Sequence, residues 1–208
     1  MDIDGVKIKW VKDFKYLGEV FEFDGSEEKT VQQRLAAAEQ RCAIMGGIFF
    51  NKNVSRRLKY NTLKTYVYPV ATYACETWTG WKRQDERLDV FWNKWVRIIC
   101  ETTKEEKNTT EMLLTSVRRT FLSEMVRRRR LKYFGHVVRY PAERLVRKSV
   151  TIEGEGRRKL GKQKQTWRGR VNADMKGARA TVEDCKKVEK NGAWFKNPRW
   201  DPLWRKEE

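Results

Sequence analysis

The sequence has no long hydrophobic run, because no stretch approaches the roughly 20 apolar residues that a membrane-spanning helix needs. Its first residues, MDIDGVKIKW, also lack the apolar core of a signal peptide. The four cysteines lie 33, 25 and 85 residues apart, which fits neither a disulfide framework nor a zinc-binding motif. We therefore expect an intracellular protein without a membrane segment, whose free thiols are buried in a reducing compartment.

Motifs that carry catalysis are missing as well. The sequence contains no GxxxxGK[ST] phosphate loop, no HExxH, no GxSxG and no adjacent pair of aspartates. The favoured interpretation of its only histidine, His136, is a side chain packed beside Phe134 with one ring nitrogen hydrogen-bonded. A phosphate or sugar contact, a general base or a metal ligand is the alternative. We predict no catalytic residue, no metal and no cofactor for this chain.

Acidic residues are few relative to basic ones. The chain has 28 Asp and Glu against 46 Lys and Arg, a net charge of +18. Between Arg118 and Arg170 there are 18 basic residues and four acidic ones, an excess of 14 in about a quarter of the chain. Such an excess is typical of a protein with a polyanionic partner. We predict RNA and/or DNA as that partner, bound through phosphates with little sequence preference.

Two basic clusters supply the candidate binding residues. Four successive arginines on a helix spread through about 300°, so we expect one or two of 127–130 to face phosphates while the others neutralise neighbouring surface. The second cluster lies in a glycine-punctuated segment, 153–165, which we expect to be a mobile loop. The candidate nucleic-acid-binding residues are Arg127, Arg128, Arg129, Arg130, Lys132, His136, Arg139, Arg157, Arg158, Lys159, Lys162, Lys164, Arg168 and Arg170.

Two further features accompany the basic clusters. Aromatic residues lie among them, and such rings can stack on bases, although core packing is the better interpretation for Phe134 and Trp167 than for Tyr133 and Tyr140. The run RRRRLK also fits a nuclear-import signal, which does not exclude binding. The expected location is the nucleus and/or the cytoplasm.

Hydrophobic periodicity predicts a mainly α fold behind a short N-terminal β-hairpin. The expected segments are a hairpin at 1–25, a helical bundle at 26–104, a basic helical segment at 105–150, and a basic loop, short helix and tryptophan-rich tail at 151–208. The predicted helices run from Glu27 to about residue 47, from a cap at Ser55 through a kink at Pro69, and over 85–100. We expect Asn108 or Thr109 to cap the helix that leads into the arginines, and a short helix at 166–175.

Several segments follow one another in a specific order. They are FKYLGEVFEFDGS (14–26), RLAAAEQRCAIMGGIF (34–49), LKTYVYPVATYACETWT (63–79), RLDVFWNKWVRIIC (87–100), RRLKYFGHVVRYPAERLV (129–146) and GKQKQTWRGRVNADM (161–175). In this order the chain resembles, over nearly its whole length, the C-terminal part of LINE-type, non-LTR retrotransposon endonuclease–reverse transcriptases.

The resemblance implies a role for each region. The FKYLG segment would be the hairpin that closes the palm and grips the primer end, carried by Phe14, Lys15, Tyr16, Leu17 and Gly18. The bundle would be the thumb, which tracks the template–primer duplex. The GHVVR motif and the basic segments would help to hold element RNA and target DNA. The paired aspartates that bind Mg²⁺ in the palm would lie upstream of Met1.

These features lead to one favoured hypothesis and two alternatives. We expect a non-catalytic nucleic-acid-binding fragment of a reverse transcriptase, with no enzyme activity of its own. It would associate with RNA or DNA and with the upstream fingers and palm. One alternative is a structural subunit of an RNA–protein assembly, joined through tryptophan-rich helices. The other is a decayed remnant without function.

Overall fold

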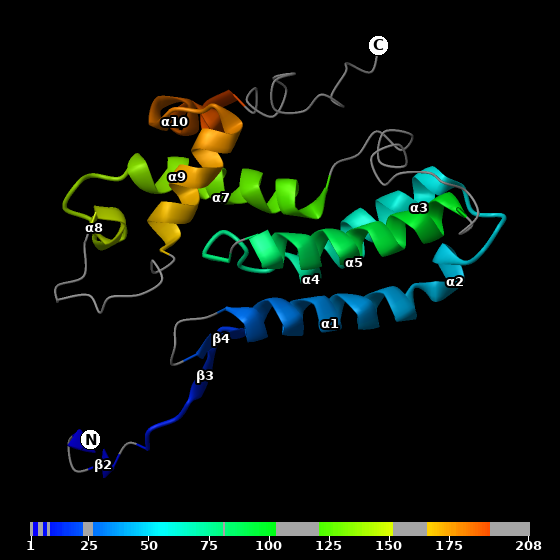
Figure 1. The fold of residues 1–208 in the computed structure, drawn as a ribbon, viewed down its shortest axis with the longest axis horizontal. Helices are drawn as coiled ribbons and strands as arrows, with labels where there is room; N and C mark the ends of the chain where they lie inside the picture. The colour runs from blue at the N-terminus through cyan, green and yellow to red at the C-terminus, as the bar shows by residue number, and fades with distance from the viewer. Residues whose placement is uncertain are drawn as a thin grey trace.

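The computed structural model describes residues 2–3, 6–7, 9–22, 27–80, 82–102, 121–151 and 166–191. These residues are mainly α-helical, and two short β-ribbons precede the helices (Figure 1). The predicted fold class, mainly α with an N-terminal hairpin, is therefore confirmed. The cap predicted at Asn108 or Thr109, the loop at 153–165 and the tail after residue 191 lie outside the described residues.

The N-terminal region contains two hairpins where the sequence predicted one. β1 (Asp2–Ile3) pairs with β2 (Val6–Lys7), and β3 (Asp13–Tyr16) pairs with β4 (Glu19–Glu22), both antiparallel. The β3–β4 loop is two residues long, and both of its residues have a positive φ, 48° at position 17 and 84° at position 18. A two-residue hairpin turn of type I′ requires this backbone conformation.

The β3–β4 hairpin is joined to the first long helix, α1 (Glu28–Ile44). The hydroxyl group of Thr30 accepts a hydrogen bond from the Val20 amide and donates one to the Val20 carbonyl, each at 3.0 Å. Val20 and Thr30 are both buried there. The β1–β2 hairpin lies further from the helical body (Figure 1).

The first predicted helix is divided into α1 and α2 (Gly46–Phe49), with a break at Met45, and a stripe of apolar residues runs along both. Its members Val31, Ala38, Cys42 and Phe49 are buried. The stripe therefore continues through the break and keeps facing the same core.

The second predicted helix consists of three pieces, α3 (Arg56–Thr62), the π-helix η1 (Leu63–Val67) and α4 (Tyr68–Ala71). Ser55 caps α3 as expected, because its hydroxyl oxygen accepts a hydrogen bond from the Leu58 amide at 3.3 Å. The interruption predicted at Pro69 takes the form of the π-helical turn just before it, since proline has no N–H to continue an α-helical ladder. Ala74 follows the end of α4 and has a φ of 55°.

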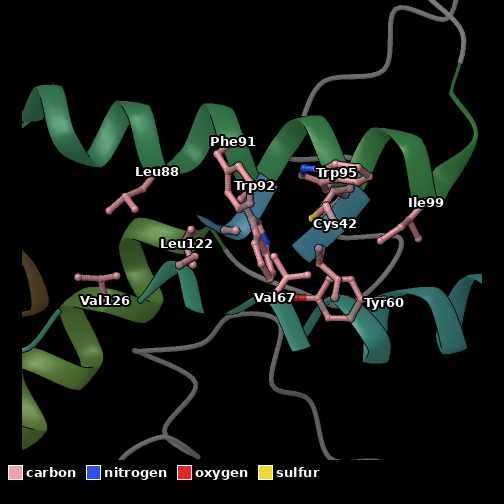
Figure 2. Packing of buried hydrophobic residues seen from close by; sticks show 14 of the residues in the cluster. Cys42, Tyr60, Val67, Leu88, Phe91, Trp92, Trp95, Ile99, Leu122 and Val126 are labelled. Carbon is pink, nitrogen blue, oxygen red and sulfur yellow. The ribbon is translucent and has the colours of Figure 1, made fainter. Parts of the chain in front are cut away.

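The third predicted helix is α5 (Lys82–Cys100), and it supplies the centre of the first hydrophobic cluster. Figure 2 shows Trp92 reaching from α5 towards Val67 and Tyr60, with Trp95 and Ile99 further along the same helix. Trp92 is fully buried, and its ring meets those of Tyr60 and Tyr68 edge-on at 6.1 and 6.3 Å. Helices α1 to α5 thus share one core.

α7 (Leu122–Val138) belongs to two cores. Leu122 and Val126 complete the first cluster, whereas Leu131, Phe134 and Val138 lie in a second one. The second cluster also takes buried residues from α8 (Leu145–Thr151), α9 (Trp167–Ala178) and α10 (Val182–Asn191). The helix predicted at 166–175 corresponds to α9, whereas α8 and α10 were not predicted.

The N-terminus of α7 is capped from another helix. Asp89 in α5 accepts hydrogen bonds from the Ser123 amide at 2.8 Å and from the Ser123 hydroxyl group at 2.6 Å. A carboxylate at a helix N-terminus satisfies amide groups that have no partner inside the helix. This contact fixes α7 against the first cluster.

The four cysteines are buried and make no disulfide, as predicted. Burial raises the pKa of the Cys42 and Cys75 thiols to about 12 and that of Cys185 to about 11. These thiols are therefore protonated at neutral pH and unreactive in the folded chain. No helix among the described residues combines the length and the apolarity needed to cross a membrane.

Candidate nucleic-acid interface

Basic and aromatic side chains line one side of α7 and continue past its end. Lys132, His136, Tyr140 and Arg144 follow at four-residue spacing, and we call these four residues the α7 strip. His136 and Tyr140 contact each other edge-on, with ring centroids 4.9 Å apart, and the Arg144 guanidinium lies 4.7 Å from the Tyr140 ring centroid. The strip is thus a connected surface, exposed at Lys132 and Arg144.

The ring of His136 is held at both nitrogens. Arg139 Nη2 lies 3.3 Å from Nδ1, and the Tyr140 hydroxyl group lies 2.8 Å from Nε2. Because a guanidinium can only donate, Nδ1 accepts, and in the neutral ring Nε2 carries the proton and donates to Tyr140. The sequence predicted a ring packed beside Phe134 with one nitrogen hydrogen-bonded; in the structure both nitrogens have partners, and the ring contacts Tyr140.

A shallow pocket of about 310 Å³ opens beside the strip, lined by Glu76, Arg129, Lys132, Tyr133 and His136. Arg129 Nε donates to Glu76 Oε1 at 2.8 Å, so the carboxylate is fixed against α7. The pocket therefore combines an anchored acid, an exposed lysine and an aromatic ring. Glu76 was not among the predicted site residues, because it lies 53 positions from Arg129 in the sequence.

The four successive arginines are engaged by carboxylates of the chain itself. Arg127 pairs with Glu124 at 2.8 Å, and Arg128 Nε lies 3.5 Å from a Glu124 oxygen. Arg129 is held by Glu76 and also donates to the Thr72 carbonyl at 3.0 Å. The expectation that one or two of these arginines face phosphates is not supported by this arrangement.

Two of the predicted binding residues are buried, so their assignment to the binding surface is wrong. Arg130 is 1% exposed and Arg170 is 6% exposed. Both are paired with Asp174, which is 4% exposed, and Arg170 also pairs with Asp85 in α5. Neither guanidinium can reach a nucleic-acid backbone, and each instead joins α9 to a neighbouring helix.

The GHVVR motif also has a structural explanation. A Cβ atom at Gly135 would lie 2.0 Å from the carbonyl oxygen of Cys185, so only glycine lets α10 approach α7 this closely. Val137 and Val138 are buried in the second cluster. Arg139 Nη1 donates to the Lys186 carbonyl at 2.9 Å. The motif therefore fastens α10 to α7.

Several cations near the α7 strip are not neutralised by any residue that the structure describes. Among the described residues, Lys132, Arg144, Arg147 and Arg168 form no ion pair with a carboxylate. Arg168 donates to the Val150 carbonyl at 3.3 Å, and its guanidinium lies 5.9 Å from the Phe134 ring centroid. Arg157, Arg158, Lys159, Lys162 and Lys164 lie outside the described residues.

Phe134 and Trp167 pack in the core, as predicted, whereas the neighbouring Tyr133 is more exposed. Phe134 is buried, and Trp167 packs against the second cluster and donates from Nε1 to the Glu76 carbonyl at 2.7 Å. Tyr133 is 36% exposed. Tyr133 and Tyr140 are therefore the aromatic residues of this surface that are open to a ligand.

The predicted hairpin motif, residues 14–18, forms β3 and its turn. Phe14 is paired with Phe21 across the hairpin, and the rings of Phe14, Tyr16 and Phe21 are more than half exposed. The turn is held by α1 and by the segment after α4, since Arg34 donates to the Gly18 carbonyl and the Tyr73 hydroxyl group donates to the Leu17 carbonyl. Lys15 is exposed and makes no contact that identifies a ligand.

Among the described residues, no group of three His, Cys, Asp or Glu side chains is placed to hold a metal ion. Comparison with protein-family models, with curated proteins and with solved structures found no match.

Proposed function

We propose that this chain is a non-catalytic nucleic-acid-binding protein, or part of one, that holds RNA or duplex DNA through phosphate contacts. The α7 strip, together with Arg147 and Arg168, is the surface that makes these contacts. The single observation that supports the proposal most directly is the set of cations there that have no carboxylate partner among the described residues. Such cations release counterions from a phosphate backbone when they bind it.

The resemblance to the C-terminal part of a non-LTR retrotransposon reverse transcriptase supports the same proposal. In that setting the chain would hold a template–primer duplex or element RNA, next to upstream fingers and palm that supply the Mg²⁺-binding aspartates. The nucleus and/or the cytoplasm is the location that such a partner implies. A structural subunit joined through tryptophans is less favoured, because Trp78, Trp92 and Trp95 are buried in the chain's own core.

The test is a binding titration on structured RNA and on duplex DNA at several salt concentrations. We expect a dissociation constant below about 100 μM at low salt and a steep loss of affinity as salt rises. Lys132→Ala/Arg144→Ala should weaken binding to all sequences and lower the slope of log affinity against log salt by about two.

The matched control removes the same charges elsewhere. Arg57→Ala/Lys64→Ala changes two exposed cations on α3 and η1, which lie at the other end of the molecule from α8 (Figure 1). It should leave the salt slope close to that of the unaltered chain. Equal effects of the two double variants would show that binding does not use the α7 strip.

A primer-extension assay with Mg²⁺ and nucleotides tests the non-catalytic part of the proposal. We expect no product from this chain alone. Extension of a primer would overturn that part.

A further inference from the structure

The carboxylate of Glu76 is anchored on one side and open on the other. Its Oε1 accepts from Arg129, whose Nη1 is itself held by the Thr72 carbonyl at 3.0 Å and the Thr72 hydroxyl group at 2.7 Å. Its backbone carbonyl accepts from Trp167 Nε1 at 2.7 Å. Oε2 makes no hydrogen bond with a described residue. Glu76 lines the pocket, so its fixed carboxylate offers there an oxygen atom, Oε2, that no described residue uses.

The other side chains that line the pocket include a cation and an aromatic ring. Lys132 is exposed and has no carboxylate partner among the described residues. Tyr133 offers aromatic surface at 36% exposure, and its ring is held edge-on against Trp167 at 6.1 Å. The volume of about 310 Å³ is at the lower end of the range of small-ligand sites, roughly 300–1,000 Å³.

These three groups restrict the ligand. A phosphate alone would satisfy Lys132 but would be repelled by Glu76. A ligand that satisfies all three needs a negative group, a flat ring and a hydrogen-bond donor. A nucleotide whose base carries an exocyclic amine has these features. Uracil and thymine also have a donor, N3–H, but it lies between two carbonyl oxygens that would be repelled by the Glu76 carboxylate.

We propose that the Glu76–Lys132–Tyr133 pocket binds a single unpaired nucleotide whose base carries an exocyclic amine. Lys132 binds the phosphate, Tyr133 stacks on the base, and Glu76 Oε2 accepts from the amine. The base must be unpaired, because in a duplex its ring faces are covered by the neighbouring base pairs and cannot stack on Tyr133. This inference rests on the proposed function, and it adds base discrimination to a surface that otherwise contacts phosphates.

His136 provides a probe of the pocket in the full chain. It is the only histidine, so its imidazole resonances in an NMR spectrum are assigned without ambiguity. Titration with AMP, CMP and GMP should shift these resonances saturably. UMP and ribose 5-phosphate should bind on the order of tenfold more weakly, because the N3–H of uracil lies between two carbonyl oxygens that Glu76 repels and ribose 5-phosphate has no base to stack on Tyr133.

Two variants separate the roles of the residues. Tyr133→Ala removes the stacking ring from an exposed position and should weaken AMP, CMP and UMP binding alike. Glu76→Gln keeps an oxygen for Arg129 and places an amide N–H₂ donor at the open position, so it should reverse the preference towards UMP, whose base offers carbonyl acceptors. A merely structural role of Glu76 would not reverse the preference.

Single-stranded oligonucleotides distinguish failure of this inference from failure of the proposed function. Tighter binding of oligo(A) and oligo(C) than of oligo(U), lost in Glu76→Gln, supports the pocket. Equal, salt-dependent binding of all three overturns the pocket and leaves the phosphate surface intact. Absence of any binding at low salt overturns both.

Discussion

The two hydrophobic clusters meet on α7 but are held together by different forces. The first contains 19 buried hydrophobic residues among those described, including Trp78, Trp92 and Trp95. The second contains seven, and Phe134 is the largest of them. A cluster this small buries little apolar surface, and hydrophobic stabilisation is roughly proportional to that surface.

The second cluster is reinforced by ion pairs instead. Asp174 in α9 lies within reach of Arg127, Arg130 and Arg170, and Arg170 extends the network to Asp85 in α5. Buried charges are stable only when they are paired, so this network specifies one docking of α9 against α7 and α5. A run of successive arginines can therefore help to form a core instead of a ligand-binding surface. Four predictions test this difference between the two clusters.

The largest expected effect is in the first cluster. Trp92→Ala should lower the free energy of unfolding by about 3–5 kcal/mol, because it leaves a large cavity in the tightest part of the core. Trp92→Phe is the control and should cost less, since the indole N–H of Trp92 has no hydrogen-bond partner to lose. Denaturant unfolding measures both, and equal costs would contradict the central role of the indole volume.

Asp174→Asn should have the next largest effect, about 3 kcal/mol, because it leaves Arg130 buried without its counter-charge and Arg170 with Asp85 alone. We expect α9 and α10 to detach first, giving two steps in thermal unfolding followed by circular dichroism. The control Glu183→Gln breaks an exposed pair with Lys186 and should cost at most about 1 kcal/mol. A single, unshifted transition in Asp174→Asn would show that the network is dispensable.

Gly135→Ala should cost about 1–3 kcal/mol by forcing α10 away from α7. The displacement should expose Cys185, whose modification by a thiol reagent can be located by mass spectrometry of the labelled peptide. Gly177→Ala in α9 is the control. Its Cβ has only Arg127 Nη1 nearby, at 4.0 Å, so it should stabilise the helix slightly. Unchanged labelling of Cys185 in Gly135→Ala would contradict the close contact.

The smallest effect concerns pH. Burial raises the pKa of Glu27, although its carboxylate accepts hydrogen bonds from the Thr79 and Gly80 amides at 2.6 and 3.2 Å. A carboxyl group with a raised folded-state pKa stabilises the fold at low pH, and this contribution is lost as pH rises through the folded-state pKa. Glu27→Gln keeps an acceptor for both amides and should make stability less dependent on pH from about pH 4 upwards. The measurement is the denaturant midpoint of the unaltered chain and of Glu27→Gln across that pH range.

Much of the local structure was predictable. The apolar stripes of α1 and α5, the cap at Ser55 and the interruption near Pro69 follow from side-chain spacing and backbone chemistry, and all are present. α10 was missed although Val182, Cys185 and Val188 recur every three residues, because this apolar stripe is short and lies among charged residues. The cap of α7 was missed because it comes from Asp89 in another helix.

The candidate site was predictable only in part. Lys132 and His136 lie on the exposed strip, but Arg130 and Arg170 are buried, and Arg144 with its contact to Tyr140 was overlooked. The four-residue spacing from Lys132 to Arg144 was a signal in the sequence that could have identified the strip.

Most of the helices and the large excess of positive charge could be predicted from the amino-acid sequence, because periodicity, caps and composition are local or additive properties. Which cations stay accessible depends on how the helices pack against one another. Glu76 lies 53 positions from Arg129, Asp174 lies 44 positions from Arg130, and Asp85, one of the two partners of Arg170, lies 85 positions from it. Charge interactions depend on distance in space, and that distance is set by how the helices pack.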